Sequence, residues 1–226
     1  MADDGPPVDL ARGDRVGGFR VRSILGWGVE GVSADVVDEF LGVRRVLKAY
    51  PAEGYWIGRL RHVAEVFGAL SAIDICPAPI VGGVGSTDRG VPLAYFVVER
   101  RIGRSLEDML RQRWSENRAI DMFESLLDRV SRVHNVGWAL GDFAGGNNIV
   151  VINRRPLFID IGFPEGAAAR PTYGEDFECL ADIARLLAQQ SRSTKLIQTA
   201  RSLVERSERR LDRRSLFTWR SRAPFA

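Results

Sequence analysis

The first hundred residues show the short, alternating pattern that is typical of β-strands. Phe19–Leu25 alternates apolar and polar side chains at a period of two, which predicts a half-buried strand. Val32–Val37 and Val43–Tyr50 predict two further strands on either side of a turn at Asp38–Gly42. Trp56–Ser71 instead repeats apolar residues at helical spacing. Two more strands follow this helix, at Ile80–Val84 and Leu93–Val98.

Beyond residue 104 the pattern becomes mostly helical. Ser105 can cap a short helix, because Asp108 stands three residues further on. Longer amphipathic stretches then alternate with a Gly- and Asn-rich loop and a pair of short apolar strands. The expected helices are Ala119–Val136, Phe177–Gln190 and Lys195–Leu211, and the expected strands are Ile149–Ile152 and Leu157–Ile161.

These elements predict an α+β fold with two lobes: an antiparallel-sheet N-lobe with one helix, and a short, mostly helical C-lobe. The segment before Phe19 is acidic and rich in Gly and Pro, which is typical of a disordered leader. The expected boundaries are a leader over 1–18, an N-lobe over 19–98, a hinge over 99–103, a C-lobe over 104–190 and a basic helix or tail over 191–226.

Composition narrows the class of protein. Apolar residues make up 45% and charged residues 27%, an ordinary globular balance. No apolar run approaches the roughly 20 residues of a membrane-spanning helix, and no secretory signal precedes the first strand, so we expect a cytoplasmic protein. Two distant cysteines, Cys76 and Cys179, and two histidines form no cluster with metal-ligand spacing.

Charge adds two observations. The net charge is +3, but the stretch from Arg201 onward carries eight arginines against three acidic residues, so this tail is a candidate contact for an acidic or phosphate-rich partner. Its other interpretation is a solvated terminal helix. Of the 32 basic residues only Lys48 and Lys195 are lysines. Since lysine is a compact point charge and arginine a wide fork, Lys48 suits a site with room for one ammonium.

A glycine-rich segment precedes this lysine. Gly26, Gly28 and Gly31 match a dinucleotide-binding turn, but that motif needs a helix next and an acidic residue about 20 positions later. Here a strand follows, and Lys48 stands 22 positions after Gly26. The arrangement therefore favours a glycine-rich loop whose amides approach a triphosphate, with the lysine on its phosphates. An ordinary hairpin turn is the alternative.

A helix carboxylate could hold that lysine in place. Glu65, on the helix after the lysine strand, is the first candidate partner of Lys48, and Glu53 is the second. The alternative for Glu65 is a solvated surface carboxylate.

The strongest pattern lies between His134 and Gly162. Asp142 is followed five residues later by Asn147, and then by a hairpin that ends in an apolar pair, Asp160 and a glycine. Asp142 would orient an acceptor hydroxyl and take its proton during phosphoryl transfer. Asn147 and Asp160 offer the oxygen ligands that Mg²⁺ prefers. A register shifted by one residue would make Asn148 the ligand.

Taken in this order, the glycine loop, Lys48, Glu65, Asp142, Asn147 and the Asp160-Ile161-Gly162 motif resemble the protein-kinase-like superfamily, from about Phe19 to Gln190. The resemblance implies a two-lobed fold that binds ATP and Mg²⁺, with a nucleotide contact at the hinge that includes Glu99. It also implies that Asp176 begins the main C-lobe helix and braces the catalytic loop.

Departures from the usual pattern indicate a minimal or atypical member. Gly141-Asp142 resembles the aminoglycoside, RIO-type and lipopolysaccharide heptose kinases, and His134 matches the lead-in of those families as a packing or capping residue. Only 16 positions separate Asp160 from Asp176, which leaves no long activation segment. The small kinase of the KEOPS complex is similarly short.

The resemblance implies an ATP- and Mg²⁺-dependent kinase that transfers a phosphoryl group to a hydroxyl. The complete glycine loop and the small C-lobe favour Ser or Thr of a protein or peptide as the acceptor; a sugar or other small molecule is the alternative. A second class is a pseudokinase that serves as a nucleotide-binding scaffold, since a fold does not establish activity. A dinucleotide-dependent oxidoreductase is disfavoured by Lys48.

Overall fold

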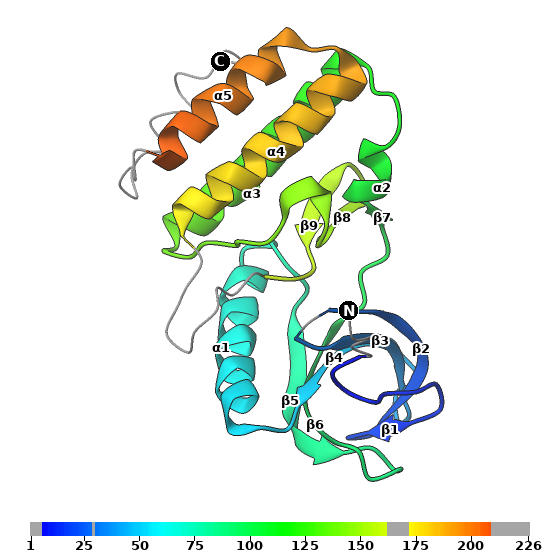
Figure 1. Cartoon of the computed structure of the whole chain (residues 1–226). Coiled ribbons are helices and arrows are strands. Elements are labelled where there is room, and N and C mark those ends of the chain that lie inside the picture. Colours follow the sequence, from blue (N-terminus) through cyan, green and yellow to red (C-terminus); the bar gives the residue numbers. More distant parts are fainter. Residues whose placement is uncertain (1–5, 29, 162–171, 209–226) are drawn as a thin grey trace, which may run out of the picture. The chain divides into compact units, whose positions relative to one another are not determined.

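The structure is a computed structural model that describes residues 6–28, 30–161 and 172–208 (Figure 1). The chain divides into two compact units, which are described separately. Unit 1 comprises Met1–Ala72 and Pro77–Arg100, and unit 2 comprises Ile73–Cys76 and Arg101–Ala226. The short segment Ile73–Cys76, which sequence patterning places in the N-lobe, thus belongs to unit 2.

Unit 1 is an antiparallel sheet with one helix, as the hydrophobic pattern predicts. The order of its six strands is β1-β2-β3-β4-β6-β5, and every neighbouring pair is antiparallel. The elements are β1 (Arg15–Val16), β2 (Phe19–Trp27), β3 (Val32–Asp38), β4 (Arg44–Pro51), α1 (Gly54–Ser71), β5 (Pro79–Ser86) and β6 (Pro92–Glu99).

The alternation along the strands separates two faces of this sheet. Val36 on β3 and Leu47 on β4 are fully buried in the core of unit 1. Because side chains alternate along a strand, Val46 and Lys48 lie on the opposite face from Leu47. Asp35 stands opposite Val46 in the register and therefore shares that second face. Because Val36 and Leu47 must point into the core, Asp35, Val46 and Lys48 must lie on the other face of the sheet.

The leader, expected to be disordered, is part of the folded core over residues 8–16. Val8, Leu10 and Val16 are buried in the same cluster as Val36, and β1 pairs with the start of β2. Sequence reasoning missed this because the apolar residues are spaced too widely among Gly, Pro and Asp to form a recognisable strand.

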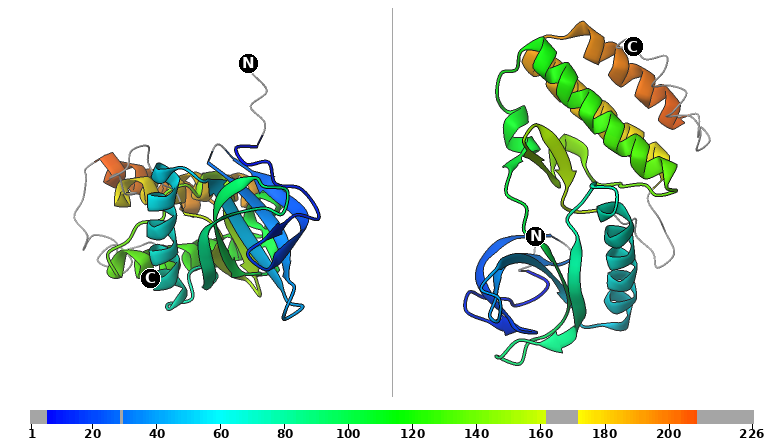
Figure 2. Two further views of the ribbon diagram at one scale, coloured as in Figure 1. Left: turned by 90° about the horizontal axis from the view of Figure 1, so that it is seen from below. Right: turned by 180° about the vertical axis from the view of Figure 1, so that it is seen from behind.

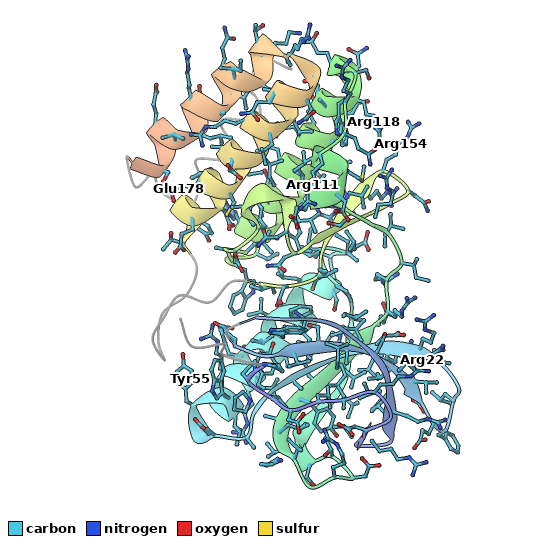
Figure 3. The ribbon with its side chains drawn as sticks, turned by 45° about the vertical axis from the view of Figure 1, so that its right-hand side comes forward. Arg22, Tyr55, Arg111, Arg118, Arg154 and Glu178 are labelled. Atoms are coloured by element: carbon cyan, nitrogen blue, oxygen red, sulfur yellow. The ribbon has the colours of Figure 1, made fainter. Side chains whose placement is uncertain are left out.

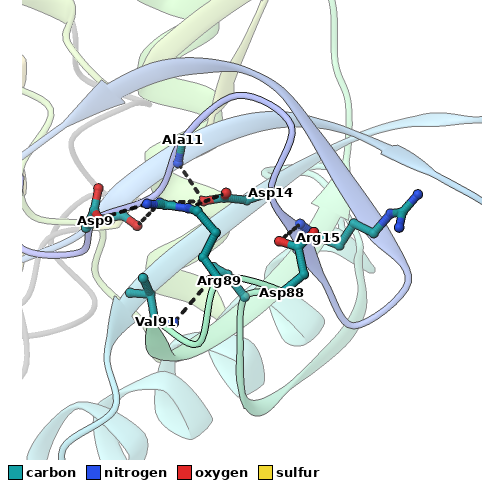
Figure 4. A network of polar contacts seen from close by, with 8 residues as sticks. Asp9, Ala11, Asp14, Arg15, Asp88, Arg89 and Val91 are labelled. Atoms are coloured by element: carbon teal, nitrogen blue, oxygen red, sulfur yellow. Dashed lines mark hydrogen bonds and ion pairs between the residues drawn. The ribbon is translucent and has the colours of Figure 1, made fainter.

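An ion pair between the buried Asp14 and the exposed Arg89 holds the leader in place (Figure 4). The Asp14 carboxylate accepts hydrogen bonds from Arg89 Nε at 2.7 Å, Arg89 Nη2 at 2.9 Å and the Ala11 amide at 2.8 Å. Arg89 also contacts the exposed Asp9 at 3.1 Å. The hydrogen bond from Arg89 lowers the pKa of Asp14.

Unit 2 is mostly helical. Its elements are β7 (Arg104–Ser105), α2 (Leu106–Leu110), α3 (Glu116–Asn135), a 3-10 turn (Ala144–Gly146), β8 (Ile149–Ile152), β9 (Arg155–Phe158), α4 (Tyr173–Ser191) and α5 (Thr194–Glu208). Helices α3, α4 and α5 lie side by side (Figures 1 and 2), and β7, β8 and β9 form a small antiparallel sheet. Along the described residues no helix is both long and apolar enough to cross a membrane.

One predicted strand boundary in unit 2 needs correction. Strand β9 begins at Arg155 rather than Leu157, because the hairpin turn is only two residues long: Asn153 and Arg154 both adopt positive φ, at 50° and 66°. Helix α5 is described to Glu208. The remainder of the predicted helix and of the basic tail, and Gly162 of the Asp-Ile-Gly motif, lie outside the described residues.

The leader's ion pair gives a stability prediction. Asp14→Asn should lower the melting temperature at about pH 7 by a few degrees, because the amide cannot replace a carboxylate that accepts from Arg89. The native pKa lies below the ordinary value of 3.8, so this contribution is present at neutral pH and is lost as the pH falls below that value. Thermal unfolding at about pH 7 and about pH 3 measures both.

The matched control is Asp9→Asn, which removes an exposed carboxylate from the same arginine. It should change the melting temperature much less. Equal effects of the two variants, or a difference between Asp14→Asn and the natural protein that is as large at about pH 3 as at about pH 7, would contradict the assigned role.

Candidate active site

Lys48 occupies a buried and well-fixed position in unit 1. It lies on β4, between β3 and β6, and stands opposite Ser33 and Phe96 in the register. The residue is only 4% exposed, and its Nζ atom lies 5.6 Å from the centre of the Phe67 ring on α1. Burying an ammonium is costly unless it meets compensating charge, so this position is unusual for a surface-type residue.

Glu65 does not join Lys48 in the described structure. Its side chain is 70% exposed and lies near His62 on the same helix, with Nδ1 at 3.8 Å from Glu65 Oε2. The buried side of α1 is instead an apolar stripe that includes Val63 and Phe67. Glu65 follows Val63 by two residues, which puts it on nearly the opposite side of the helix. The prediction that Glu65 pairs with Lys48 is therefore wrong for this structure.

No other carboxylate on this helix can take the place of Glu65. All residues of α1 are described, and Glu65 is the single acidic one among Gly54–Ser71. The alternative partner Glu53 stands at the N-cap position and is exposed. The helix thus presents aliphatic and aromatic groups, rather than a carboxylate, toward Lys48.

The three glycines of the loop differ in what the fold demands of them. A Cβ at Gly31 would lie 2.4 Å from the Ala49 carbonyl oxygen, so the close approach of β4 requires glycine there. A Cβ at Gly26 or Gly28 would meet nothing within 4 Å. The Gly28 amide donates to the Gly31 carbonyl at 3.0 Å and closes the turn. Gly26 and Gly28 therefore leave open space that the packing of unit 1 does not need.

Glu99, the predicted hinge contact, ends β6. It stands opposite Arg45 on β4, and its amide donates to the Ala78 carbonyl at 3.0 Å. The backbone at this point is held on both sides.

In unit 2 the loop before Asp142 is held by a buried carboxylate. Asp176, near the start of α4, is fully buried and accepts hydrogen bonds from the amides of Leu140 at 3.0 Å and Gly141 at 2.7 Å. His134 Nε2 lies 2.7 Å from the same carboxylate. Burial raises the pKa of Asp176, while the hydrogen bonds with His134, Leu140 and Gly141 oppose that shift. The predicted bracing role of Asp176 matches this geometry.

A second carboxylate of the same helix fixes the loop further along. Asp182 Oδ2 accepts from the Gly145 amide at 2.7 Å. Gly145 and Gly146 have φ of 65° and 79°, a conformation that favours glycine. Sequence analysis missed Asp182. The available signal was its position on α4, six residues after Asp176.

Asp142 itself stays exposed, although its loop is held from below. The Asn148 side-chain amide donates to the Asp142 carbonyl at 2.9 Å and to its Oδ2 at 3.2 Å. The Asn148 carbonyl in turn accepts from the Ile159 amide at 2.8 Å. Asn148 thus connects Asp142 to the strand end that carries Asp160. Within unit 2, Asn148 therefore contacts Asp142 through its side chain and the residue before Asp160 through its backbone.

Asn147 has a different environment. Its Oδ1 atom is buried and has no hydrogen-bond partner within the described ranges. Asp160 is half-buried, and its Oδ1 accepts from the Ile161 amide at 3.0 Å. Asn148, rather than Asn147, has its side chain against Asp142, and which of the two asparagines binds a metal stays a prediction.

The oxygens present suit a hard cation. Asp160 offers a carboxylate, and Asn148 offers a carboxamide oxygen that its own bonds to Asp142 leave unused, which is the donor set that Mg²⁺ takes together with phosphate and water. Over the described parts of the chain no cluster of three or more His, Cys, Asp and Glu side chains could hold a metal. The residues therefore fit a Mg²⁺ that depends partly on nucleotide oxygens.

Comparisons with solved structures agree with this fold. Two structures of the PknI kinase domain of Mycobacterium tuberculosis are similar to the chain. A single-residue mutant has a TM-score of 0.59 at 18% identity, covering 88% of this chain and 87% of its own. The other has a TM-score of 0.55 at 13% identity, covering 89% and 98%. No protein-family model and no curated protein matches the sequence. The chain has the fold of a kinase domain.

The bracing carboxylate gives the second prediction. Asp176→Asn should reduce the free energy of unfolding by about 3 kcal/mol, because the variant's amide group turns a donor toward the amides of Leu140 and Gly141 and leaves buried groups unpaired. Urea unfolding followed by tryptophan fluorescence measures it. Glu178→Gln, an exposed acid-to-amide change on the same helix, should change stability little. Equal effects would refute the role of Asp176.

Proposed function

We propose that this protein is an ATP- and Mg²⁺-dependent phosphotransferase that moves the γ-phosphoryl group of ATP to a hydroxyl. The observation that carries the proposal is the constellation in unit 2: an exposed Asp142 on a loop held by buried Asp176, with Asn148 connecting it to the strand end at Asp160. A structural role alone would not need an exposed carboxylate on so firmly held a loop.

The residues divide the chemistry among themselves. Asp142 accepts a hydrogen bond from the acceptor hydroxyl and takes its proton as the oxygen attacks the γ-phosphorus. The bond from that phosphorus to the bridging oxygen breaks, and ADP leaves with the electron pair. The open space beside Gly26 and Gly28 lets the phosphates approach the loop backbone, and Lys48 supplies a positive charge to them.

Asp160 and Asn148 are the residues that would hold Mg²⁺. The ion neutralises developing negative charge on the phosphates when it is bound. Asn148 keeps its side-chain NH2 group on Asp142, and these bonds do not use its side-chain oxygen, so it can position the aspartate and the ion together. In this proposal Asn148 takes the role that the five-residue spacing gives to Asn147.

We further propose Ser or Thr of a protein or peptide as the acceptor, and a minimal type of kinase. The support is the glycine loop, which is complete at Gly26, Gly28 and Gly31, and the few elements that the described part of unit 2 offers for a small-molecule pocket. The short distance between Asp160 and Asp176 in the sequence supports the minimal type.

One observation favours a second candidate function, a nucleotide-binding scaffold without transfer. Kinase activity normally needs an ion pair between the strand lysine and a helix glutamate, and here the helix's single acid, Glu65, is exposed and pairs with His62. An active enzyme must then hold the Lys48 ammonium with another group, such as the phosphates themselves.

Phosphoryl transfer from labelled ATP separates the two candidates. With Mg²⁺ and a lysate of the source cells, the natural protein should label an acceptor, and Asp142→Asn should reduce the rate by at least about a hundredfold, because the proton then has no acceptor. Asp121→Asn, an exposed acid on α3, should retain full activity. Lys48→Arg should also reduce transfer strongly, since the fork cannot replace the ammonium.

The location of the label identifies the acceptor: a protein band agrees with the proposal, and a small metabolite points to the alternative substrate class. ATP binding by the natural protein with no transfer under any of these conditions, and unchanged binding in Asp142→Asn, would establish the scaffold instead.

The two asparagines make a separate prediction. Asn148→Ala should raise the Mg²⁺ concentration needed for half-maximal ATP binding by about tenfold, because it removes both a ligand and a support of Asp142. Asn147→Ala should have a smaller effect on that titration. A larger effect of Asn147→Ala would return the ligand role to Asn147.

A further inference from the structure

The turn between β3 and β4 exposes an unusual set of apolar side chains. Phe40 is 94% exposed, Leu41 60% and Val43 40%, three of four consecutive positions. Scattered single exposures of this kind are ordinary, but grouped ones mark interaction sites. Phe40 is the most exposed of the large apolar residues in the described ranges.

The turn is well ordered by hydrogen bonds of its own. Asp38 Oδ1 accepts from the amides of Phe40 at 3.0 Å and Leu41 at 2.9 Å, and the Gly42 amide donates to the Asp38 carbonyl at 2.8 Å. The last strand pair before the turn is Asp38 with Phe19. The apolar side chains are thus held out beyond the sheet by a built turn rather than left on a loose loop.

Arginines surround the base of this turn. Arg20 on β2 and Arg44 on β4 both stand opposite Val37 on β3, so their side chains share one face of the sheet. Together with Arg12 and Arg22 they line a hollow of about 470 Å³. Figure 3 shows Arg22 at the surface of unit 1.

Carboxylates neutralise this arginine cluster only in part. Glu39 is shared by Arg15 at 3.2 Å and Arg20 at 3.3 Å, and the buried Asp35 is shared by Arg44 and Arg100. Each carboxylate therefore balances one of two guanidiniums. Arg12 and Arg22 are exposed and have no acidic partner along the described residues. Figure 4 shows the Arg15 side chain directed away from Asp14 and Asp88.

We propose that the β3–β4 turn and the arginines around it form a docking surface for an anionic lipid membrane. Exposed apolar side chains next to several guanidiniums match a partner whose negatively charged surface covers an apolar interior. An anionic lipid bilayer has this structure. Phe40 and Leu41 would enter the acyl boundary, while the arginines contact lipid phosphates, which their forked donors suit. This surface is independent of the proposed phosphotransfer.

Vesicle co-sedimentation of the full chain tests the proposal. The protein should bind vesicles of phosphatidylcholine with one third phosphatidylglycerol, and bind pure phosphatidylcholine at least about tenfold more weakly, with binding falling as salt is raised. The double variant Phe40→Ser, Leu41→Ser should lose at least about tenfold in partitioning. Arg12→Gln with Arg22→Gln should weaken binding to the anionic vesicles specifically.

Matched controls are Val84→Ser, an apolar residue of β5 that is 54% exposed, and Arg61→Gln, an exposed arginine on α1. Both should bind like the natural protein, and unchanged melting temperatures establish that every variant is folded. Three results would overturn the proposal: no vesicle binding by the natural protein, binding that survives the Phe40 and Leu41 changes, which would place it in another basic segment, or a dimer in ultracentrifugation that the same changes dissolve without any vesicle binding.

Discussion

The candidate site depends on one buried carboxylate. Asp176 has no exposed surface, and its oxygens are occupied by the amides of Leu140 and Gly141 and by His134. A charge so deeply buried is tolerated only when such donors replace its hydration. The loop is consequently held to helix α4 immediately before Asp142, whose own carboxylate is exposed. The position of Asp142 thus follows from the hydrogen bonds that Leu140 and Gly141 donate to Asp176.

In unit 1, by contrast, the relevant feature is backbone that the packing leaves accessible. The packing demands glycine at position 31 but not at 26 or 28, so the latter two are free to serve a ligand. Lys48 is buried beside Phe67 on a strand held from both sides. Its expected partner Glu65 faces solvent because Val63 and Phe67 occupy the buried stripe of α1. The absence of a Lys48–Glu65 ion pair is the observation that favours the alternative of a nucleotide-binding scaffold.

Shared carboxylates organise the arginines on the surface of unit 1. Asp35 and Glu39 each hold two arginines, which fixes the orientation of the guanidiniums without neutralising them. The apolar turn at Phe40 lies next to this excess of positive charge. Arginine is well suited to such sharing, because its planar fork can serve a carboxylate and still offer donors to a second anion.

Periodicity alone predicted the sheet, the single helix of unit 1 and the amphipathic helices of unit 2, because each buries one face and burial leaves a regular apolar pattern. The spacing of Asp142, Asp160 and Asp176 likewise predicted a phosphotransfer site, and that chemistry stays a prediction. The tertiary structure decided three things that have no such period. It folded Val8 and Leu10 into the core, turned Glu65 away from Lys48, and placed Asn148 rather than Asn147 against Asp142. Each depends on helix rotation, a positive φ or a long-range contact, which only packing fixes.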